Sequence, residues 1–499
     1  MSVYVGLDVG TQSVKLLAYD ADAERVVVGA GQSLALDERA DGSREQRAEW
    51  WIDAIRACFA ELDPALRSRV TAIGVSGQQH GFVPLDRDGR VLAPAKLWCD
   101  TSSSAECEAV MAAAGGAARC IELAGNPILA GYTASKLPWT RAHRPDAYAR
   151  LASILLPHDY VDFWLTGERW MERGDASGTG WLDVRTREWS APMLAATDPD
   201  RDLGECLPPL VDAGATFPIR PAVADELGLS RAVRVSAGGG DNMMAAIGTG
   251  NVAAGVLTVS LGTSGTVFAH AERPVVDADA RWAAFCDSTG GWLPLVCTMN
   301  CTVATEAVAG LAGFSSREGD ALLAGTRPGA DGLLMLPFLN GERTPDLPHG
   351  RGSLFGITGA NLTRANLYRA AMEGALYSLK NGYDALVEAG LRFDAMRLTG
   401  GGSRSAAWRQ MAADVFGLPV DVPEQPEGAA FGAALQALWA SAREREGASA
   451  ASMAEVARRH VRLAPGLAVR PDAGAVAVHG AHYRRFLDHL DAIRPLYSG

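Results

Sequence analysis

The sequence lacks the features that mark membrane, secreted and nucleic-acid-binding proteins. No uninterrupted apolar stretch approaches the roughly 18 residues of a membrane span. The N-terminus opens directly on a strand-like run, Val3–Leu7, without a charged and apolar leader. Aspartate and glutamate (58) outnumber lysine and arginine (46), which leaves a net charge of −12 and no basic stripe. We therefore expect a cytoplasmic protein that does not bind nucleic acid.

Cysteine and histidine are too scattered to indicate a metal centre. The eight cysteines include no CxxC pair. Cys297 and Cys301 are spaced by about one helical turn, but no histidine pair accompanies them. Scattered thiols in a chain without a leader are typical of reduced, buried cysteines in an intracellular protein. Neither a zinc site nor a disulfide framework is expected.

The common nucleotide-binding and hydrolase motifs are also absent. A P-loop places a lysine directly after a glycine, and none of the four lysines does this (Lys15, Lys96, Lys136 and Lys380). The dinucleotide fingerprint does not follow the first strand-like run, and no GxSxG elbow appears. Any nucleotide chemistry must therefore use another fold.

What is present is a globular composition, 48% hydrophobic and 21% charged, in a chain of 499 residues that is long enough for two domains. Strand-like and helical runs alternate, which is typical of an α/β fold. The predicted strands span 2–7, 14–20, 25–33, 71–76, 233–237, 254–260, 266–270, 396–399 and 420–422, and the predicted helices 48–62, 364–389, 405–416, 429–442 and 481–493. We expect an N-terminal domain over 1–247, a second domain over 248–445, and a C-terminal extension with a terminal helix over 446–499.

Two local patterns occur twice, about half a chain apart. The first is a predicted β-hairpin with a Gly-Thr turn, in Asp8–Val14 and again in Ser260–Thr266. The second is a strand, three glycines and a helix N-cap, in Val235–Asp241 and again in Leu398–Ser403. Repetition of this kind indicates two related domains that face each other.

The two Gly-Thr turns, Gly10-Thr11 and Gly262-Thr263, suggest phosphate binding. Glycine lets the main chain approach a ligand and present several amide donors. One such turn alone is more often an ordinary β-turn, whereas two across a cleft could hold both ends of a triphosphate. Asp8 ends the first strand, where a carboxylate would position Mg²⁺ beside phosphates or simply form the turn.

Asp241 is the strongest single candidate for catalysis. It follows Gly238–Gly240 and precedes an apolar helical run. An aspartate there could merely cap the helix. The three glycines suggest instead that something large approaches the backbone, and a carboxylate at that place can take the proton of an attacking hydroxyl in phosphoryl transfer.

A polar segment that follows a predicted strand suggests where a sugar binds. Gly77-Gln78-Gln79-His80-Gly81 comes directly after the strand that ends at Ser76. Amide and imidazole groups at the carboxyl end of a strand can hydrogen-bond hydroxyls in the crevice there. A lone histidine would usually be structural, but beside two glutamines His80 is predicted to contact the ligand.

Together these motifs resemble the FGGY carbohydrate kinases, and within that family the xylulokinases, over essentially the whole chain. The matching segments are 5–11, 155–160, 165–168, 260–265, 341–345, 372–375, 398–405 and 408–410. The resemblance implies an α/β fold of two ribonuclease-H-like domains, as in actin and hexokinase, around a central cleft. It also implies ATP and Mg²⁺ as co-substrate and metal, and a homodimer by analogy alone.

The resemblance also assigns roles by position. Asp241 would be the catalytic base and Asp8 the acidic residue that serves Mg-ATP. The sugar would contact Gln79, His80, Asp241 and Asn242. The ATP-binding positions would be Gly10, Thr11, Gly262, Thr263, Gly401, Gly402 and Ser405.

Three positions depart from the family pattern and bear on the choice of sugar. Gln79 stands where many members have methionine, Trp98–Ser102 lacks a common arginine, and His158 replaces a common lysine. The expected reaction is phosphorylation of D-xylulose to D-xylulose 5-phosphate. The alternatives are a sibling kinase for ribulose, a deoxyketose, a polyol or glycerol, a non-catalytic sugar- or nucleotide-binding regulator, and an actin-like polymerising ATPase.

Overall fold

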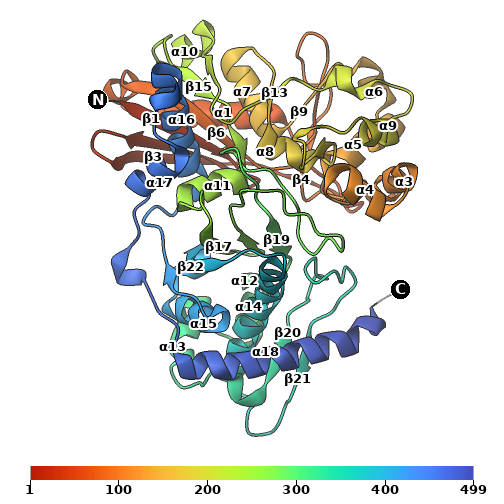
Figure 1. The fold of residues 1–499 in the computed structure, drawn as a ribbon, viewed down its shortest axis with the longest axis vertical. Coiled ribbons are helices and arrows are strands. Elements are labelled where there is room, and N and C mark those ends of the chain that lie inside the picture. The colour runs from red at the N-terminus through yellow and green to blue at the C-terminus, as the bar shows by residue number, and fades with distance from the viewer. Residues whose placement is uncertain (1, 498–499) are drawn as a thin grey trace.

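The protein consists of two α/β bodies stacked end to end, with the long helix α18 (Ala473–Ile493) lying across the far end of the second (Figure 1). The computed structural model describes residues 2–497. Within that range no helix has the length and apolar character needed to cross a membrane. The predicted terminal helix is present and begins earlier than expected, because the Asp472 side chain caps it by accepting from the Ala475 amide.

The first body is built on a sheet in the order β14-β15-β6-β1-β2-β3, with β16 also pairing with β6. The first three strands along the chain form an antiparallel meander, and β6 and β15 continue the sheet in parallel. The strands are β1 (Val3–Val9), β2 (Ser13–Asp20), β3 (Arg25–Ser33), β6 (Val70–Gly77), β14 (Thr216–Pro218), β15 (Arg234–Ser236) and β16 (Gly239–Gly240).

The second body repeats this topology. Its sheet has the order β19-β18-β17-β22-β23, again an antiparallel meander followed by two parallel strands. The strands are β17 (Gly255–Leu261), β18 (Gly265–Phe268), β19 (Leu295–Thr298), β22 (Phe393–Thr399) and β23 (Val420–Asp421). The predicted α/β fold with two related bodies is therefore confirmed.

Helices cover both sheets where the sequence predicts them. In the first body α1 (Ala48–Ala60) packs on β2 and β3 with Trp51, Ile55 and Phe59, whose spacing places them on one helix face. In the second body α14 (Arg364–Glu388) and α15 (Ala406–Phe416) pack together over the main core. A group of smaller helices extends from the first body (Figure 1): α3 (Ser104–Ala114), α4 (Ala117–Ala124), α5 (Thr133–His143) and α9 (Ala191–Thr197).

Helix α16 (Gly428–Glu446) comes late in the chain yet packs on the first sheet, against β1 and β6 (Figure 1). Alternate residues of β1 point to opposite faces: Val5 and its odd-numbered neighbours join the core with α1, whereas Tyr4 joins the core with α16. A Cβ on Gly6 would lie 1.8 Å from the Ala430 carbonyl oxygen, so only glycine permits this close packing. The domain limits 1–247, 248–445 and 446–499 stay a prediction, and α16 lies spatially with the first body.

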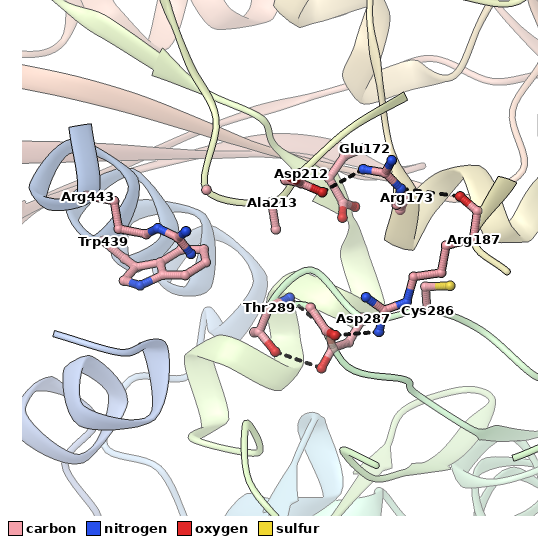
Figure 2. Close-up of a pocket in the computed structure, with 12 residues that line it drawn as sticks. Glu172, Arg173, Arg187, Asp212, Ala213, Cys286, Asp287, Thr289, Trp439 and Arg443 are labelled. Carbon is pink, nitrogen blue, oxygen red and sulfur yellow. Dashed lines mark hydrogen bonds and ion pairs between the residues drawn. The ribbon is translucent and has the colours of Figure 1, made fainter. Parts of the chain in front are cut away.

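Figure 2 shows a second place where a segment that follows β18 packs against the first body. There the turn that carries Asp287, helix α16 and the loop at Asp212 surround a cavity of about 190 Å³. Ser288 Oγ donates to Glu172 Oε2 at 2.8 Å, and Arg187 Nη2 donates to the Gly291 carbonyl at 3.1 Å. These contacts tie the segment that follows β18 to the first body.

Candidate active site

Asp8 and Asp241 meet at the carboxyl ends of neighbouring parallel strands. Strand β6 lies between β1 and β16. Its residue Ser76 pairs with Asp8 of β1 on one side and with Gly239 of β16 on the other. The Ser76 hydroxyl donates to Asp8 Oδ1 at 2.9 Å. Asp241 then opens α11 (Asp241–Thr249). The hairpin that carries Asp8 and the helix start that carries Asp241 are far apart in the sequence, but they lie side by side at one edge of the sheet.

The carboxyl group of Asp241 is not used as a helix cap. Gly240 occupies the N-cap position, and Asp241 Oδ1 accepts from the backbone amide and the Nδ2 of Asn242 at 2.7 and 2.9 Å. Burial, and after it the nearby charges of Asp8 and Asp175, raise the pKa of Asp241 to about 7 against the lowering effect of the hydrogen bonds from Asn242. A carboxylate that titrates near neutrality is suited to act as a general base.

A cavity of about 400 Å³ lies between the two bodies and brings all four predicted sugar-side residues together. The first body contributes Gln79, His80, Asp241 and Asn242. The second body contributes residues of the second hairpin, namely Ser260, Ser264 and Thr266. The predicted base and the hairpin that carries the second Gly-Thr turn therefore face the same space, although Gly262 and Thr263 themselves are not among the described residues that line it.

Gln79 offers a free donor to this cavity. Its Oε1 accepts from Asn242 Nδ2 at 3.0 Å, which fixes the orientation of the amide. Gln79 Nε2 is buried and has no hydrogen-bond partner among the described residues. Because a buried donor without a partner is costly, an acceptor on a ligand is expected there.

His80 offers an acceptor to the same cavity. Its backbone has a φ of 64°, an unusual value for a residue other than glycine, and its Nδ1 donates to the Gly178 carbonyl at 2.6 Å. The ring stacks on Tyr132 with centroids 4.6 Å apart. Burial lowers the pKa of His80 to about 3, so the ring is neutral and Nε2 is left as an acceptor.

The first Gly-Thr turn is held by hydrogen bonds to the rest of the first body. The Gly10 amide donates to the Ser13 carbonyl, which closes the predicted hairpin. The Thr11 hydroxyl donates to Gln78 Oε1 at 3.0 Å and accepts from Trp98 Nε1 at 2.9 Å. Because the Thr11 side chain is used inside the protein, any phosphate contact at this turn falls to the backbone.

The second Gly-Thr turn rests on the start of a helix. Gly262 N donates to the Ser264 carbonyl, and the amides of Cys301 and Thr302 donate to the carbonyls of Thr263 and Gly262 at 3.0 and 2.9 Å. Helix α12 (Thr302–Ala312) begins at this point. The partial positive charge of a helix N-terminus thus lies behind the turn, which favours an anion nearby.

The second glycine triplet leaves open space. Gly400 has a φ of 80°, and a Cβ on Gly401 would meet nothing within 4 Å. The predicted cap at Ser403 is wrong: Ser405 caps α15, because its Oγ accepts from the Trp408 amide at 3.1 Å while donating to Asp320 at 2.8 Å. The gap at Gly401 is the kind of space that a purine ring could occupy.

Comparison with known proteins identifies the family. The model of the N-terminal domain of the FGGY family of carbohydrate kinases matches residues 3–248, and that of its C-terminal domain matches residues 257–441. The chain belongs to this family. It is an ATP-dependent carbohydrate kinase, and the predicted actin- and hexokinase-like fold is confirmed by its solved relatives.

Several relatives align with the kinase over nearly its full length. It is 40% identical to the xylulose kinase of Haemophilus influenzae, over 98% of this chain and 100% of that one. The structure described as a “xyloylose kinase” from Brucella ovis superposes with a TM-score of 0.92 at 33% identity, covering 99% of this chain and 100% of that one. A gluconate kinase from Lactobacillus acidophilus superposes with a TM-score of 0.91 at 20% identity, covering 99% of each chain, so the fold alone does not select the sugar.

Two residues at the departures from the family pattern, Asp100 and His158, do not line the cavity of the kinase. Asp100 is fully buried, where Lys96 Nζ lies 2.9 Å from its carboxylate and the Arg44 amide donates to it. His158 is fully buried between Asp175, at 2.6 Å, and Asp159, at 3.0 Å. Gln79 lines the cavity, and the Trp98–Ser102 segment reaches it through Trp98.

Several cavity-lining residues of the kinase were not predicted from the sequence. Tyr132 and Phe285 flank His80, with ring centroids 4.6 and 5.7 Å from its imidazole. Arg343 enters from the second body. The segment Gly341–Pro345 matched a family motif, but nothing in its sequence indicated a role at the sugar.

Proposed function

We propose that this kinase transfers the γ-phosphoryl group of ATP to D-xylulose and forms D-xylulose 5-phosphate. Relatives named xylulose kinase are 33–40% identical over most of the chain, which favours this sugar. The observation that carries the proposal is the meeting of three complementary groups in one cavity. These are the carboxylate of Asp241, the free donor of Gln79 and the free acceptor of His80.

In the proposed mechanism Asp241 accepts the proton of the terminal hydroxyl of the sugar. The hydroxyl oxygen then forms a bond to the γ-phosphorus while the bond from that phosphorus to the bridging oxygen breaks, and ADP leaves. Gln79, His80 and Asn242 hold the sugar so that the hydroxyl lies within reach of the base. Closure of the two bodies over the cavity would exclude water and limit hydrolysis of ATP.

ATP is proposed to lie between the two Gly-Thr turns and the second glycine triplet. The Gly10 and Gly262 amides close the turns themselves. The amides of Thr11 and Thr263 would therefore be the donors to the phosphates, and the start of α12 behind the second turn would supply positive potential. Gly401, Gly402 and Ser405 would line the purine, for which the open space at Gly401 leaves room.

The residues at Asp8 fit a magnesium ion bound chiefly through the nucleotide. Among residues 2–497 no group of three or more acidic, histidine or cysteine side chains could hold a metal by itself. This suits Mg²⁺, which keeps most of its water and uses one or two carboxylates together with phosphates. Burial raises the pKa of Asp8 to about 6, a cost that a bound cation would offset. When bound, Mg²⁺ would neutralise charge on the phosphates.

Replacing Asp8 tests this assignment. Asp8→Ala is expected to impair productive use of Mg-ATP, seen as a higher KM for Mg-ATP and an altered dependence of the rate on Mg²⁺. The affinity for sugar alone, measured by calorimetry, should change little. An unchanged rate together with an unchanged Mg²⁺ dependence would contradict the role.

A substrate panel tests the proposed function directly. ADP release would be measured with ketoses, aldoses, polyols and gluconate at equal concentration. We expect the highest kcat/KM with D-xylulose. A higher value with ribulose, glycerol or another member would reassign the sugar, and sugar binding without any ADP release would indicate a regulator.

Three further proposals rest on the family resemblance and the predicted boundaries. These are a homodimer, a cytoplasmic location, and division of the chain at residues 247 and 445. Light scattering would measure the mass of the assembly, with a mass of one chain contradicting the dimer. It would also reveal any growth of filaments in the presence of ATP.

A further inference from the structure

The cavity between the two bodies contains one permanent positive charge. Among the described residues that line it, Arg343 is the only lysine or arginine, whereas Asp241, Asp279 and Asp346 are acidic. The Arg343 side chain is exposed and has no ion-pair partner among residues 2–497. A guanidinium that faces a cavity without a carboxylate partner is free to bind a ligand.

The backbone of Arg343 is held firmly by the residue before it. The buried carboxylate of Glu342 accepts from the amides of Arg343 and Met299 at 2.8 and 2.5 Å and from Asn300 Nδ2 at 3.1 Å. Asn300 Nδ2 also donates to the Gly341 carbonyl at 2.6 Å. The next residues along that segment, Cys301 and Thr302, support the second Gly-Thr turn. Arg343 and that turn are therefore fixed parts of the same body.

The guanidinium lies toward the sugar side of the cavity. Its charge acts on His80, Tyr132 and Cys297, and it lies against the Cys297 side chain. By contrast, the main charges that act on Asp241 are those of Asp8 and Asp175. Arg343 therefore lines the cavity near the stacked rings of His80 and Tyr132, and its charge is not among the main ones that act on Asp241.

The chemistry of this pair of residues favours a ketone over an alcohol, because a hydroxyl in place of the carbonyl can accept from the guanidinium only with its own proton turned away. A guanidinium can only donate hydrogen bonds, and the Nε2 of neutral His80 can only accept one. The end of a ketose carries a carbonyl oxygen, which only accepts, next to a hydroxyl group that can donate. Donor and acceptor on the protein therefore match acceptor and donor on the sugar.

We propose that Arg343 is a specificity-determining residue that donates to the carbonyl oxygen of the ketose, at the end of the sugar opposite the hydroxyl that is phosphorylated. This inference rests on the proposed function. The contact comes from the second body, so it forms fully only when the bodies close on a sugar that carries the carbonyl. A pentitol places a hydroxyl at that point and gains less from the guanidinium.

The test compares D-xylulose with D-arabinitol, its reduced pentitol, in the wild type and in Arg343→Gln. We expect kcat/KM for the ketose to fall about 10- to 100-fold, the scale of a hydrogen bond to a charged group. The kcat/KM of the pentitol, or its inhibition constant if it is not turned over, should change less than about threefold, and KM for ATP should not change. Arg343→Lys, which keeps the charge but not the fork of donors, should lie between.

Arg351→Gln is the matched control, because Arg351 is exposed on the same loop and donates only to nearby backbone carbonyls. It should leave the ratio of ketose to pentitol unchanged. Equal losses for both sugars in Arg343→Gln would overturn the inference, as would a raised KM for ATP with no effect on the sugar. Failure of the proposed function looks different, because the wild type itself would then show no activity with D-xylulose.

Discussion

The two glycine triplets arise from the same local pattern and have opposite surroundings. At the first, a Cβ on Gly239 would lie 2.5 Å from the Ser288 hydroxyl, and one on Gly240 would lie 2.7 Å from Gln79 Cγ. At the second, a Cβ on Gly401 would meet nothing within 4 Å. Protein groups crowd all the glycines of the first triplet, whereas in the second a Cβ on Gly400 or Gly402 would lie 2.7 Å from Leu261 and the middle glycine, Gly401, faces open space.

The start of the helix that comes after each triplet differs in the same way. Asp241 is placed in a setting that raises its pKa, with acidic groups packed behind the glycines. A Cβ on Gly238 would lie 2.8 Å from both Asp162 Oδ2 and the His158 ring. Ser405 has an ordinary structural role as a helix cap. This contrast supports the proposal that the first triplet serves reactivity and that the second leaves room for the nucleotide.

The largest expected effect is loss of the carboxylate after the first triplet. Asp241→Asn keeps the shape of the side chain and its place at the start of α11 but cannot take a proton. We expect kcat to fall at least about 100-fold, the usual contribution of a general base, with the fold retained by circular dichroism. Turnover close to that of the wild type would remove Asp241 from the mechanism.

Adding one methyl group to each triplet sharpens the comparison. Gly240→Ala would push a Cβ against Gln79 and Asp175, so we expect a lower melting temperature, from about 1–3 kcal/mol of overpacking, and a weaker affinity for sugar. Gly401→Ala should leave the melting temperature unchanged and raise KM for ATP alone. Equal effects of the two substitutions on sugar and ATP would contradict the division of roles.

The pH dependence of the rate should report the ionisation of Asp241, the residue after the first triplet. Because the pKa of Asp241 is raised to about 7 and the base must be ionised, kcat/KM for the sugar should rise with pH up to that value and then level off. Profiles with fixed, saturating Mg-ATP would measure this. An acid limb centred near the ordinary aspartate value of 3.8 would show that the surroundings do not perturb the group.

The same shift has a consequence for stability. Since the pKa of Asp241 is higher in the folded chain than in the unfolded one, protonation favours folding, and this stabilisation is lost as the pH rises from about 4 to about 7. Asp241→Asn should therefore melt at a higher temperature than the wild type at pH 8. The difference should disappear below pH 4, and calorimetry at both pH values checks it.

The smallest expected effect concerns the cap after the second triplet. Ser405→Ala removes the bond from the Trp408 amide and the bond to Asp320, and should cost about 0.5–2 kcal/mol of stability. Ser405→Thr is the matched control, because it keeps the hydroxyl and should lose less. Thermal denaturation measures both. A loss of stability in Ser405→Ala as large as that in Gly240→Ala would contradict the expected difference between the two triplets.

Local sequence predicted the features that one short segment defines. The hairpins at Asp8 and Ser260, the glycine triplets and the position of Asp241 all follow from neighbouring residue types, and the structure has them where expected. Tyr132, Phe285 and Arg343 could not be found this way. Each reaches the cavity from a different distant segment, and a single aromatic or arginine in a loop carries no periodic signal.

Helical periodicity likewise predicted α16 without indicating which sheet it covers. Its sequence lies among elements of the second body, and the glycines that decide its position, Gly6 and Gly74, lie far away near the start of the chain. A Cβ on Gly74 would meet the Ala433 carbonyl oxygen at 2.1 Å. Close packing of this kind is a property of two surfaces together and is not encoded in either segment alone.

The return of α16 to the first sheet sets an order of events during synthesis. The ribosome releases β1, β2 and β6 long before residue 428, so the sheet face with Tyr4, Leu17 and Ala72 has no cover at that stage. Although domains usually fold in turn as they emerge, this first one must wait for nearly the whole polypeptide. The two halves of the enzyme therefore mature together, and a chain released before α16 leaves its earliest strands open to chaperones and proteases.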